Sequence, residues 1–179
     1  MVNVSTRVFV ALGANMPFEG MAGPQLLARA VAAMQAEELV PRALSGVWQT
    51  EAWPQGSGQP DYYNAVAQLD GAGWEPQPLY AVLARIERAF GRERRERWAP
   101  RTLDLDIVAM DGFVGEFGAV TLPHPRMQDR AFVLAPLAEL APDWRHPGSG
   151  LSVAELLAAL SPGYRYQRIG DLSSASAVG

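Results

Sequence analysis

Residues 102–110 read Thr102-Leu103-Asp104-Leu105-Asp106-Ile107-Val108-Ala109-Met110. Side chains of a β-strand alternate between its two faces, so the three apolar side chains of Leu103, Leu105 and Ile107 share one face. Asp104 and Asp106 then share the other face. The pattern predicts a buried strand with two carboxylates on one side.

The chain before this strand predicts three more strands and two helices. A helix over Leu79–Phe90 follows Pro78, has an apolar stripe at helical spacing, and ends at Gly91. The remaining predicted elements, in chain order, are a strand at 7–13, a helix at Gln25–Leu39, and strands at Ala43–Thr50 and Tyr62–Leu69. The order βαββαβ predicts an α+β, ferredoxin-like fold, with two helices packed on one antiparallel sheet.

The C-terminal part predicts helical additions to this core, at Gln128–Leu140 and Val153–Leu160. No linker-like segment divides the chain, so we expect a single domain over residues 1–170. Residues 171–179 are small and polar, which predicts a flexible tail.

The composition excludes several kinds of chemistry. The 179 residues are 49% hydrophobic and 19% charged, which suffices for a buried core. There is no cysteine, which excludes disulfides, cysteine nucleophiles and thiolate zinc sites. All 15 basic residues are arginine, which excludes a P-loop lysine and a Schiff-base lysine. The net charge of −4 and the lack of a long apolar run argue against nucleic-acid or membrane binding. We expect a cytoplasmic monomer that acts on small molecules.

The two aspartates and the arginines before them suggest a nucleotide site. Seven of the 15 arginines lie between Arg85 and Arg101. Two carboxylates about 6.6 Å apart on a buried strand repel each other, and Mg²⁺, which prefers oxygen ligands, relieves that repulsion. Magnesium and arginine together supply the positive charge that phosphoryl transfer needs. The simpler alternatives are an acidic, half-exposed strand face and arginines paired with Glu87, Glu93 and Glu96.

Two other segments contain residues suited to ligands. His124 lies between two prolines, and Arg126 and Arg130 offer bidentate contacts to phosphate. Tyr62 and Asn64 share a strand face, where a ring and an amide suit a flat heteroaromatic ligand. A structural histidine, surface arginines and core aromatics are the alternatives.

These residues, in this order, resemble the 6-hydroxymethyl-7,8-dihydropterin pyrophosphokinase family of folate biosynthesis, over roughly residues 7–160. The matching motifs are Gly13-Ala14-Asn15, Thr50 with Trp53, Tyr62-x-Asn64, Glu87 with Gly91-Arg92, Arg97-Trp98-Ala99-Pro100-Arg101-Thr102-Leu103-Asp104-Leu105-Asp106, Pro123-His124-Pro125-Arg126-Met127 and Arg130-x-Phe132. The resemblance implies transfer of the terminal diphosphate of ATP to the pterin hydroxymethyl oxygen, with release of AMP.

The resemblance also implies roles for single residues. Asp104 and Asp106 would hold two Mg²⁺ ions and, with Arg92 and Arg101, form the catalytic group. The pterin side would consist of Gly13, Thr50, Ala52, Trp53, Tyr62, Asn64 and Phe132. The ATP side would consist of Glu87, Arg92, Arg97, Trp98, Arg101, Ile107, Thr121, His124 and Arg130.

The motif supplies no evident catalytic base, so we hypothesise that no side chain is an essential general base. Two other functions are compatible with the residues. One is a two-metal phosphoryl or nucleotidyl transferase with a different acceptor, and the other is a non-catalytic ferredoxin-like module that binds a ligand.

Overall fold

The computed structural model describes residues 6–52, 56–91 and 102–172 of the chain. Its elements are β1 (Arg7–Ala14), α1 (Gly23–Ala36), β2 (Pro41–Leu44), β3 (Gly46–Thr50), β4 (Tyr62–Asp70), α2 (Pro76–Ala89), β5 (Asp104–Met110), β6 (Gly115–Phe117), β7 (Val120–Leu122), η1 (Met127–Asp129), α3 (Ala131–Leu140), α4 (Val153–Ala159) and β8 (Tyr166–Asp171). The main sheet is antiparallel in the order β5-β1-β4-β3-β8, with β2 also on β4, and β6 pairs with β7 apart from it. The βαββαβ core and the α+β class are confirmed.

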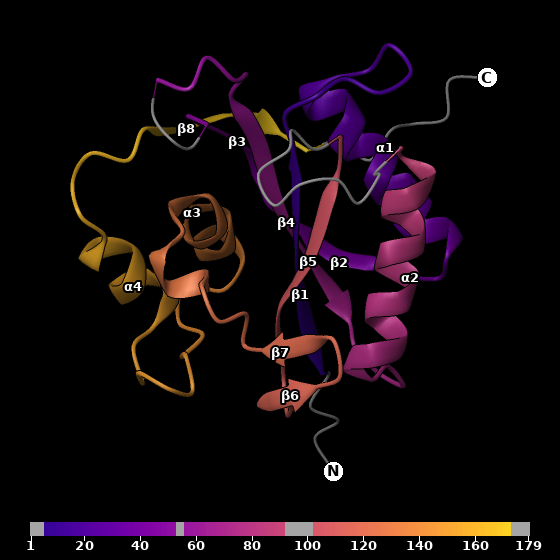
Figure 1. Cartoon of the computed structure of the whole chain (residues 1–179). Helices are drawn as coiled ribbons and strands as arrows, with labels where there is room; N and C mark the ends of the chain where they lie inside the picture. Colours follow the sequence, from indigo (N-terminus) through magenta and orange to yellow (C-terminus); the bar gives the residue numbers. More distant parts are fainter. Residues whose placement is uncertain (1–5, 53–55, 92–101, 173–179) are drawn as a thin grey trace.

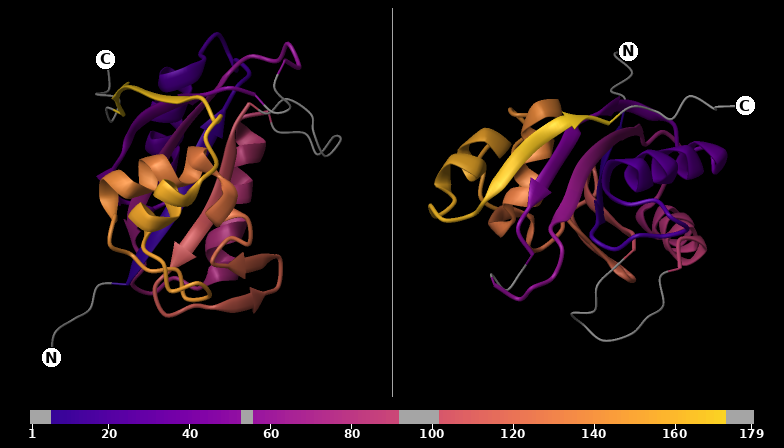
Figure 2. Two further views of the ribbon diagram at one scale, coloured as in Figure 1. Left: turned by 90° about the vertical axis from the view of Figure 1, so that its left-hand side faces the viewer. Right: turned by 90° about the horizontal axis from the view of Figure 1, so that it is seen from above.

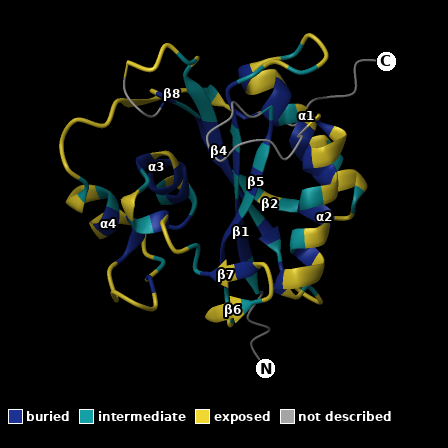
Figure 3. Cartoon of the chain, viewed as in Figure 1, coloured by how far each residue is buried: buried dark blue, intermediate teal, exposed yellow. Residues whose placement is uncertain are grey.

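The sheet separates two layers of helices (Figures 1 and 2). On one face, α1 and α2 enclose the larger hydrophobic core with the side chains of Val10, Leu12 and Leu105. On the other face, α3 and α4 cover Phe9, Val66 and Val108. Buried residues follow the strands and the inner sides of the helices (Figure 3). Within the described ranges no helix is long and apolar enough to cross a membrane.

The first helix ends three residues earlier than the pattern predicts. Glu38 has a φ of +64°, a left-handed conformation usually taken by glycine, and the helix ends before it. The amide of Leu39 donates to the Met34 carbonyl and that of Glu38 to the Gln35 carbonyl, which satisfies the last carbonyls of the helix. Leu39 is buried, so its apolar side chain continues the helical pattern beyond the helix.

The strand predicted over Ala43–Thr50 is two strands, β2 and β3, separated by Ser45. The Ser45 hydroxyl accepts the Val66 amide at 2.8 Å and donates to the Gly46 carbonyl at 2.7 Å. Because this side chain replaces a regular bond of the ladder, the strand is interrupted while both parts stay on β4.

The C-terminal strand β8 is not predicted by the sequence pattern. It pairs with β3 from Gly46 opposite Asp171 to Thr50 opposite Tyr166. Leu172, after the strand, is buried in the larger core. Asp171 and Leu172, which the sequence assigned to the tail, therefore belong to the folded part, while residues 173–179 lie outside the described ranges.

The helix predicted over Gln128–Leu140 is interrupted at Arg130. This residue has an extended backbone, with φ −117° and ψ 100°, between the short helix η1 and α3. The interruption places Arg130 immediately before α3 and Phe132 in the first turn of that helix.

A buried histidine in the loop before α4 predicts that the protein is less stable at acidic pH. His146 is buried, and its Nδ1 accepts the amides of Gly148 and Ser149 at 3.1 and 3.3 Å. Burial lowers the pKa of His146 below its ordinary 6.5. As the pH decreases below about 6.5, His146 is protonated in the unfolded chain before it is protonated in the folded chain. The free energy of unfolding therefore decreases as the pH decreases, by at most about 1.4 kcal/mol per pH unit.

The expected result in urea unfolding is a free energy that is constant above pH 7 and decreases towards pH 5.5. The control is His146→Asn, whose Oδ1 keeps an acceptor near the same place but does not titrate. This variant should lose the part of the pH slope due to His146. An unchanged slope would contradict the assignment.

Candidate active site

The two aspartates of β5 lie on the sheet face that α3 and α4 cover only in part. Asp104 is opposite Gly13 of β1, and Asp106 is opposite Ala11. Residues directly opposite each other in an antiparallel pair project to the same face. On this face, α3 and α4 cover Phe9 of β1 and Val108 of β5. The two aspartates lie further along β5, where the helical cover ends. The predicted alternation is confirmed, because Leu103, Leu105 and Ile107 are buried on the other face.

Small residues on β1 leave space beside the carboxylates. Gly13 has no side chain and Ala11 has only a methyl group. A Cβ added at Gly13 would lie 3.2 Å from Asn64 Oδ1, so even a methyl group there would press on the neighbouring amide. Two carboxylates beside bare backbone fit Mg²⁺, since it takes few protein oxygens and completes its shell with water and phosphate. Among the described residues, no group of three or more acidic or histidine side chains is placed to hold a metal alone.

A buried polar pair lies on the same face, on β3 and β4. Asn64 Nδ2 donates to Thr50 Oγ1 at 2.9 Å, and both residues are buried. Asn64 is opposite Gly13, and Tyr62 is opposite Thr50. The side chains of Thr50, Tyr62 and Asn64 therefore face the same region as the aspartates, across β1. A fixed amide–hydroxyl pair beside an aromatic ring can bind the polar edge of a flat heterocycle.

The start of α3 and the loop before it add cationic and aromatic groups. The Arg130 guanidinium lies 5.4 Å from the centre of the Phe132 ring, which is 37% exposed. The His124 amide donates to the Val108 carbonyl of β5 at 2.7 Å, and its Nδ1 accepts the Arg126 amide at 3.2 Å.

Burial is the main cause that lowers the pKa of His124; Arg130 and Arg126 lower it further, while Asp104 opposes them. His124 is thus neutral at pH 7. Because Nδ1 accepts a hydrogen bond, the proton is on Nε2, which can donate to an anion such as phosphate.

The remaining predicted site residues differ in where they lie. The side chain of Ile107 is in the core between the sheet and α2, so it does not reach the face of the aspartates. Glu87, on α2, bonds to the backbone of β5 from that same layer. Thr121 is exposed on β7, and Ala52 is buried after β3. Trp53, Arg92, Arg97, Trp98 and Arg101 lie outside the described residues.

The sequence interpretation missed two aromatic residues on the site face. Trp48 is opposite Asn64 on one side and Arg168 on the other, and Tyr166 is opposite Thr50. The rings of Trp48 and Tyr166 lie 5.9 Å apart. Because β8 was not predicted, nothing in the pattern indicated that Tyr166 lies beside Thr50.

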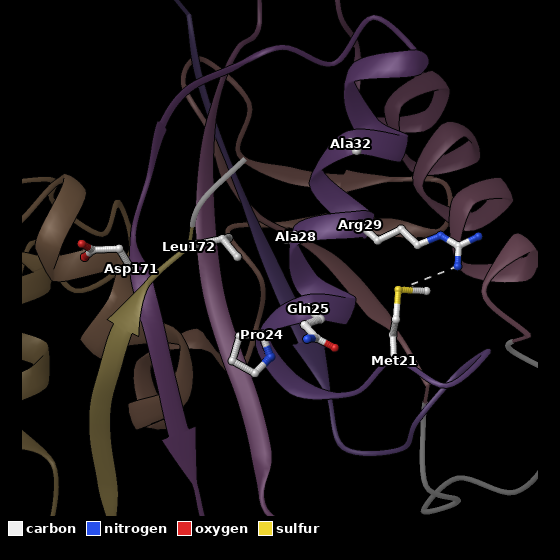
Figure 4. Close-up of a pocket in the computed structure, with 8 residues that line it drawn as sticks. All are labelled: Met21, Pro24, Gln25, Ala28, Arg29, Ala32, Asp171 and Leu172. Atoms are coloured by element: carbon white, nitrogen blue, oxygen red, sulfur yellow. Dashed lines mark hydrogen bonds between the residues drawn. The ribbon is translucent and has the colours of Figure 1, made fainter. Parts of the chain in front are cut away.

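A separate cavity of about 490 Å³ lies along the outer side of α1 and the end of β8 (Figure 4). Most of its lining is apolar or small, and Arg29 and Asp171 are its charged residues. It lies on the α1 side of the sheet, so it is distinct from the face with the aspartates.

Comparison with known proteins relates the chain to a family. Residues 9–142 match the family described as 7,8-dihydro-6-hydroxymethylpterin-pyrophosphokinase, HPPK. A pyrophosphokinase of this name from Pseudomonas aeruginosa is 42% identical over 158 residues, which cover 86% of this chain and 91% of the relative. The enzyme of the same name from Methylorubrum extorquens is 37% identical over 161 residues, 88% of this chain and 95% of the relative.

Other matches cover only part of longer proteins. The relative from Synechocystis is 48% identical over 102 residues, which are 57% of this chain and 52% of that protein. The wild-type HPPK-DHPS protein of Plasmodium falciparum has a TM-score of 0.64 at 10% identity, over 86% of this chain and 43% of that one. This likeness shows a shared fold. From the match over residues 9–142 and the identity with relatives that are covered over 91% and 95% of their length, the chain belongs to the 7,8-dihydro-6-hydroxymethylpterin-pyrophosphokinase family.

Proposed function

We propose that this chain transfers the terminal diphosphate of ATP to the hydroxymethyl oxygen of 6-hydroxymethyl-7,8-dihydropterin. The hydroxymethyl oxygen forms a bond to the β-phosphorus, and the bond from that phosphorus to the oxygen bridging to the α-phosphate breaks. AMP leaves with the bridging oxygen, and the hydroxyl proton passes to solvent. The products are AMP and the pterin diphosphate, an intermediate in the synthesis of folate.

One observation carries the proposal: the Asp104–Asp106 pair and the Thr50–Asn64 pair lie on one sheet face, separated by Ala11 and Gly13 of β1. This arrangement suits a polyphosphate at β5 and a pterin at β3 and β4. Holding both substrates on a rigid sheet supplies proximity and alignment, which are large contributions to phosphoryl transfer. Tyr62 and Phe132 would stack on the pterin, and Arg130 and His124 would bind phosphate.

Asp104 and Asp106 would hold two Mg²⁺ ions. When bound, these ions neutralise the phosphate oxygens and lower the pKa of the attacking alcohol. Arg92 and Arg101 would add positive charge at the same phosphates, as the family resemblance implies. We also propose that the protein is a monomer and acts in the cytoplasm, because ATP and the pterin are both small soluble molecules. Light scattering with and without ATP tests the oligomeric state.

The proposal is tested by phosphorus NMR of a mixture of the protein, ATP, Mg²⁺ and 6-hydroxymethyl-7,8-dihydropterin. One AMP formed for each pterin diphosphate supports diphosphate transfer. Formation of ADP would indicate transfer of a single phosphoryl group. ATP binding without turnover would favour a transferase with another acceptor.

The position of His124 predicts that it is not the general base. Its Nδ1 lone pair accepts the Arg126 amide at 3.2 Å, and the proton of the neutral ring is then on Nε2, so neither nitrogen offers a free lone pair to the substrate hydroxyl. In His124→Gln, the side-chain amide can still donate near the position of Nε2. We expect kcat to fall by no more than about 10-fold, with the shape of the pH–rate profile unchanged between pH 6 and 9. Loss of a limb of the wild-type profile in this variant would contradict the prediction.

A further inference from the structure

A carboxylate of α2 is bonded to the backbone of β5 between the two aspartates. Glu87 Oε1 accepts the amide of Leu105 at 2.7 Å. Glu87 is 8% exposed, an uncommon position for a glutamate. Since burial of a carboxylate is costly, its hydrogen bonds must offset a large loss of hydration, and bonds from an amide to a charged acceptor are among the stronger ones.

The bonded amide lies at a free edge of the sheet. Among the described residues, β5 is an outer strand of the main sheet, paired with β1 on one edge and with no described strand of that sheet on the other. Backbone amides alternate in direction along an antiparallel strand, and the Leu105 amide that reaches Glu87 therefore points away from β1. Those of Asp104 and Asp106 point towards β1. The strand is thus held on both edges at the two carboxylates, by β1 and by Glu87.

A second bond joins the same two elements nearby. Thr102 Oγ1 donates to the Phe90 carbonyl, just after α2, at 2.6 Å. Two bonds from α2 and its end therefore hold the start of β5, at Thr102 and at Leu105. The bond at Leu105 alone lies between the aspartates, where a shift of the backbone would change the separation and direction of both carboxylates.

We infer that Glu87 is a positioning residue for the carboxylate pair of Asp104 and Asp106, through the Leu105 amide. This inference rests on the proposed function, because it gives Glu87 a role in the metal-dependent step. It differs from the role implied by the family resemblance, in which Glu87 lies on the ATP side. Residues that orient metal ligands typically change metal affinity or activity by about 10- to 100-fold when they are lost.

The test compares Glu87→Ala with Glu87→Gln. Alanine removes the acceptor, while glutamine keeps an oxygen at the same reach and removes the charge. We expect Glu87→Ala to raise the Mg²⁺ concentration for half-maximal AMP formation by about 10-fold or more, and Glu87→Gln by less than about 3-fold. The Kd for Mn²⁺ in the presence of a non-hydrolysable ATP analogue, from electron paramagnetic resonance, should change in the same ratio.

Amide hydrogen exchange by NMR provides a readout that does not depend on turnover. The Leu105 amide should be protected in the wild type and in Glu87→Gln, and should exchange at least about 10-fold faster in Glu87→Ala. Leu83→Ala is the control, because Leu83 is fully buried on the same helix while the acceptor of the Leu105 amide is Glu87. It should lower stability by about 2–5 kcal/mol without changing the Mg²⁺ requirement.

Three results would overturn the inference. The first is a faster Leu105 exchange in Glu87→Ala with unchanged Mg²⁺ and Mn²⁺ dependence. The second is a Glu87→Gln variant as impaired as Glu87→Ala, which would assign the effect to charge. The third, which applies even if the variants fail to fold, is an unprotected Leu105 amide in the wild type. If the wild type forms no AMP, the proposed function fails, while Mn²⁺ binding and amide exchange still decide the role of Glu87.

Discussion

Replacement of Asp104 or Asp106 by alanine is expected to lower kcat by at least about 10³-fold, which corresponds to about 4 kcal/mol of transition-state stabilisation. Both carboxylates face Ala11 and Gly13, and no third acidic or histidine side chain of the described residues completes a metal cluster with them. Each aspartate therefore supplies a large fraction of the protein oxygens available to Mg²⁺. AMP formation under saturating ATP and pterin, at several Mg²⁺ concentrations, measures the loss.

The matched control for these variants is Asp143→Ala, which removes an exposed carboxylate between α3 and α4. It should retain kcat within about 2-fold, since a surface carboxylate contributes little. Circular dichroism establishes that each variant is folded. An Asp104→Ala or Asp106→Ala variant that keeps more than about a tenth of wild-type kcat would refute the metal-binding role of that residue.

Replacement of Asn64 by alanine is expected to reduce kcat/KM for the pterin by about 10²- to 10³-fold and to change the KM for ATP by less than about 3-fold. The amide of Asn64 is buried and bonded to Thr50, so its loss removes a hydrogen-bonding group from the pterin side and leaves the Thr50 hydroxyl without this partner. Initial rates at varied pterin and varied ATP separate the two effects.

Two companion variants sharpen this test. In the double variant Thr50→Val/Asn64→Ala, the losses in kcat/KM for the pterin should be less than additive, because the two residues share one hydrogen bond. Gln68→Ala removes a half-buried amide further along β4 and should leave both KM values unchanged. Equal losses for ATP and pterin in Asn64→Ala would contradict the division of the face into a phosphate side and a pterin side.

Much of this fold could be predicted because regular alternation dominates its central strands. On β5, Asp104 and Asp106 alternate with apolar residues, and β1 places Ala11 and Gly13 opposite them. The irregular elements follow from tertiary contacts that a local pattern does not contain. The hydroxyl of Ser45 interrupts a strand by bonding to Val66, which is 21 residues away in the sequence.

The C-terminal strand β8 also depends on contacts that the local sequence pattern does not contain. Five of the six residues of β8 are exposed, so the strand has no buried apolar face that would appear in the sequence as alternation. What holds the strand is its pairing with β3 and the bonds of Arg168 to Glu139 and Asp171. Of these partners, β3 and Glu139 lie far along the chain and leave no local signature in the sequence.

The placement of polar side chains was predicted best where residue chemistry and strand alternation coincide, since Asp104, Asp106 and Asn64 lie on one face of the sheet. The bond of Glu87 to the Leu105 amide was not predicted, since spacing shows that a glutamate lies on the inner side of a helix but not which group it bonds. A buried acid on an otherwise apolar helical stripe is a usable signal: its partner is to be sought among backbone amides of an edge strand as well as among ligands.

The bare main chain of β1 at Ala11 and Gly13 has a consequence for inhibitor design. A compound that rests on this segment contacts atoms common to every amino acid, so a substitution can weaken it only by adding bulk. Bulk at Gly13 meets the Asn64 amide at 3.2 Å, and that amide belongs to the proposed pterin side. Resistance by enlargement at this position would therefore also impair use of the natural substrate.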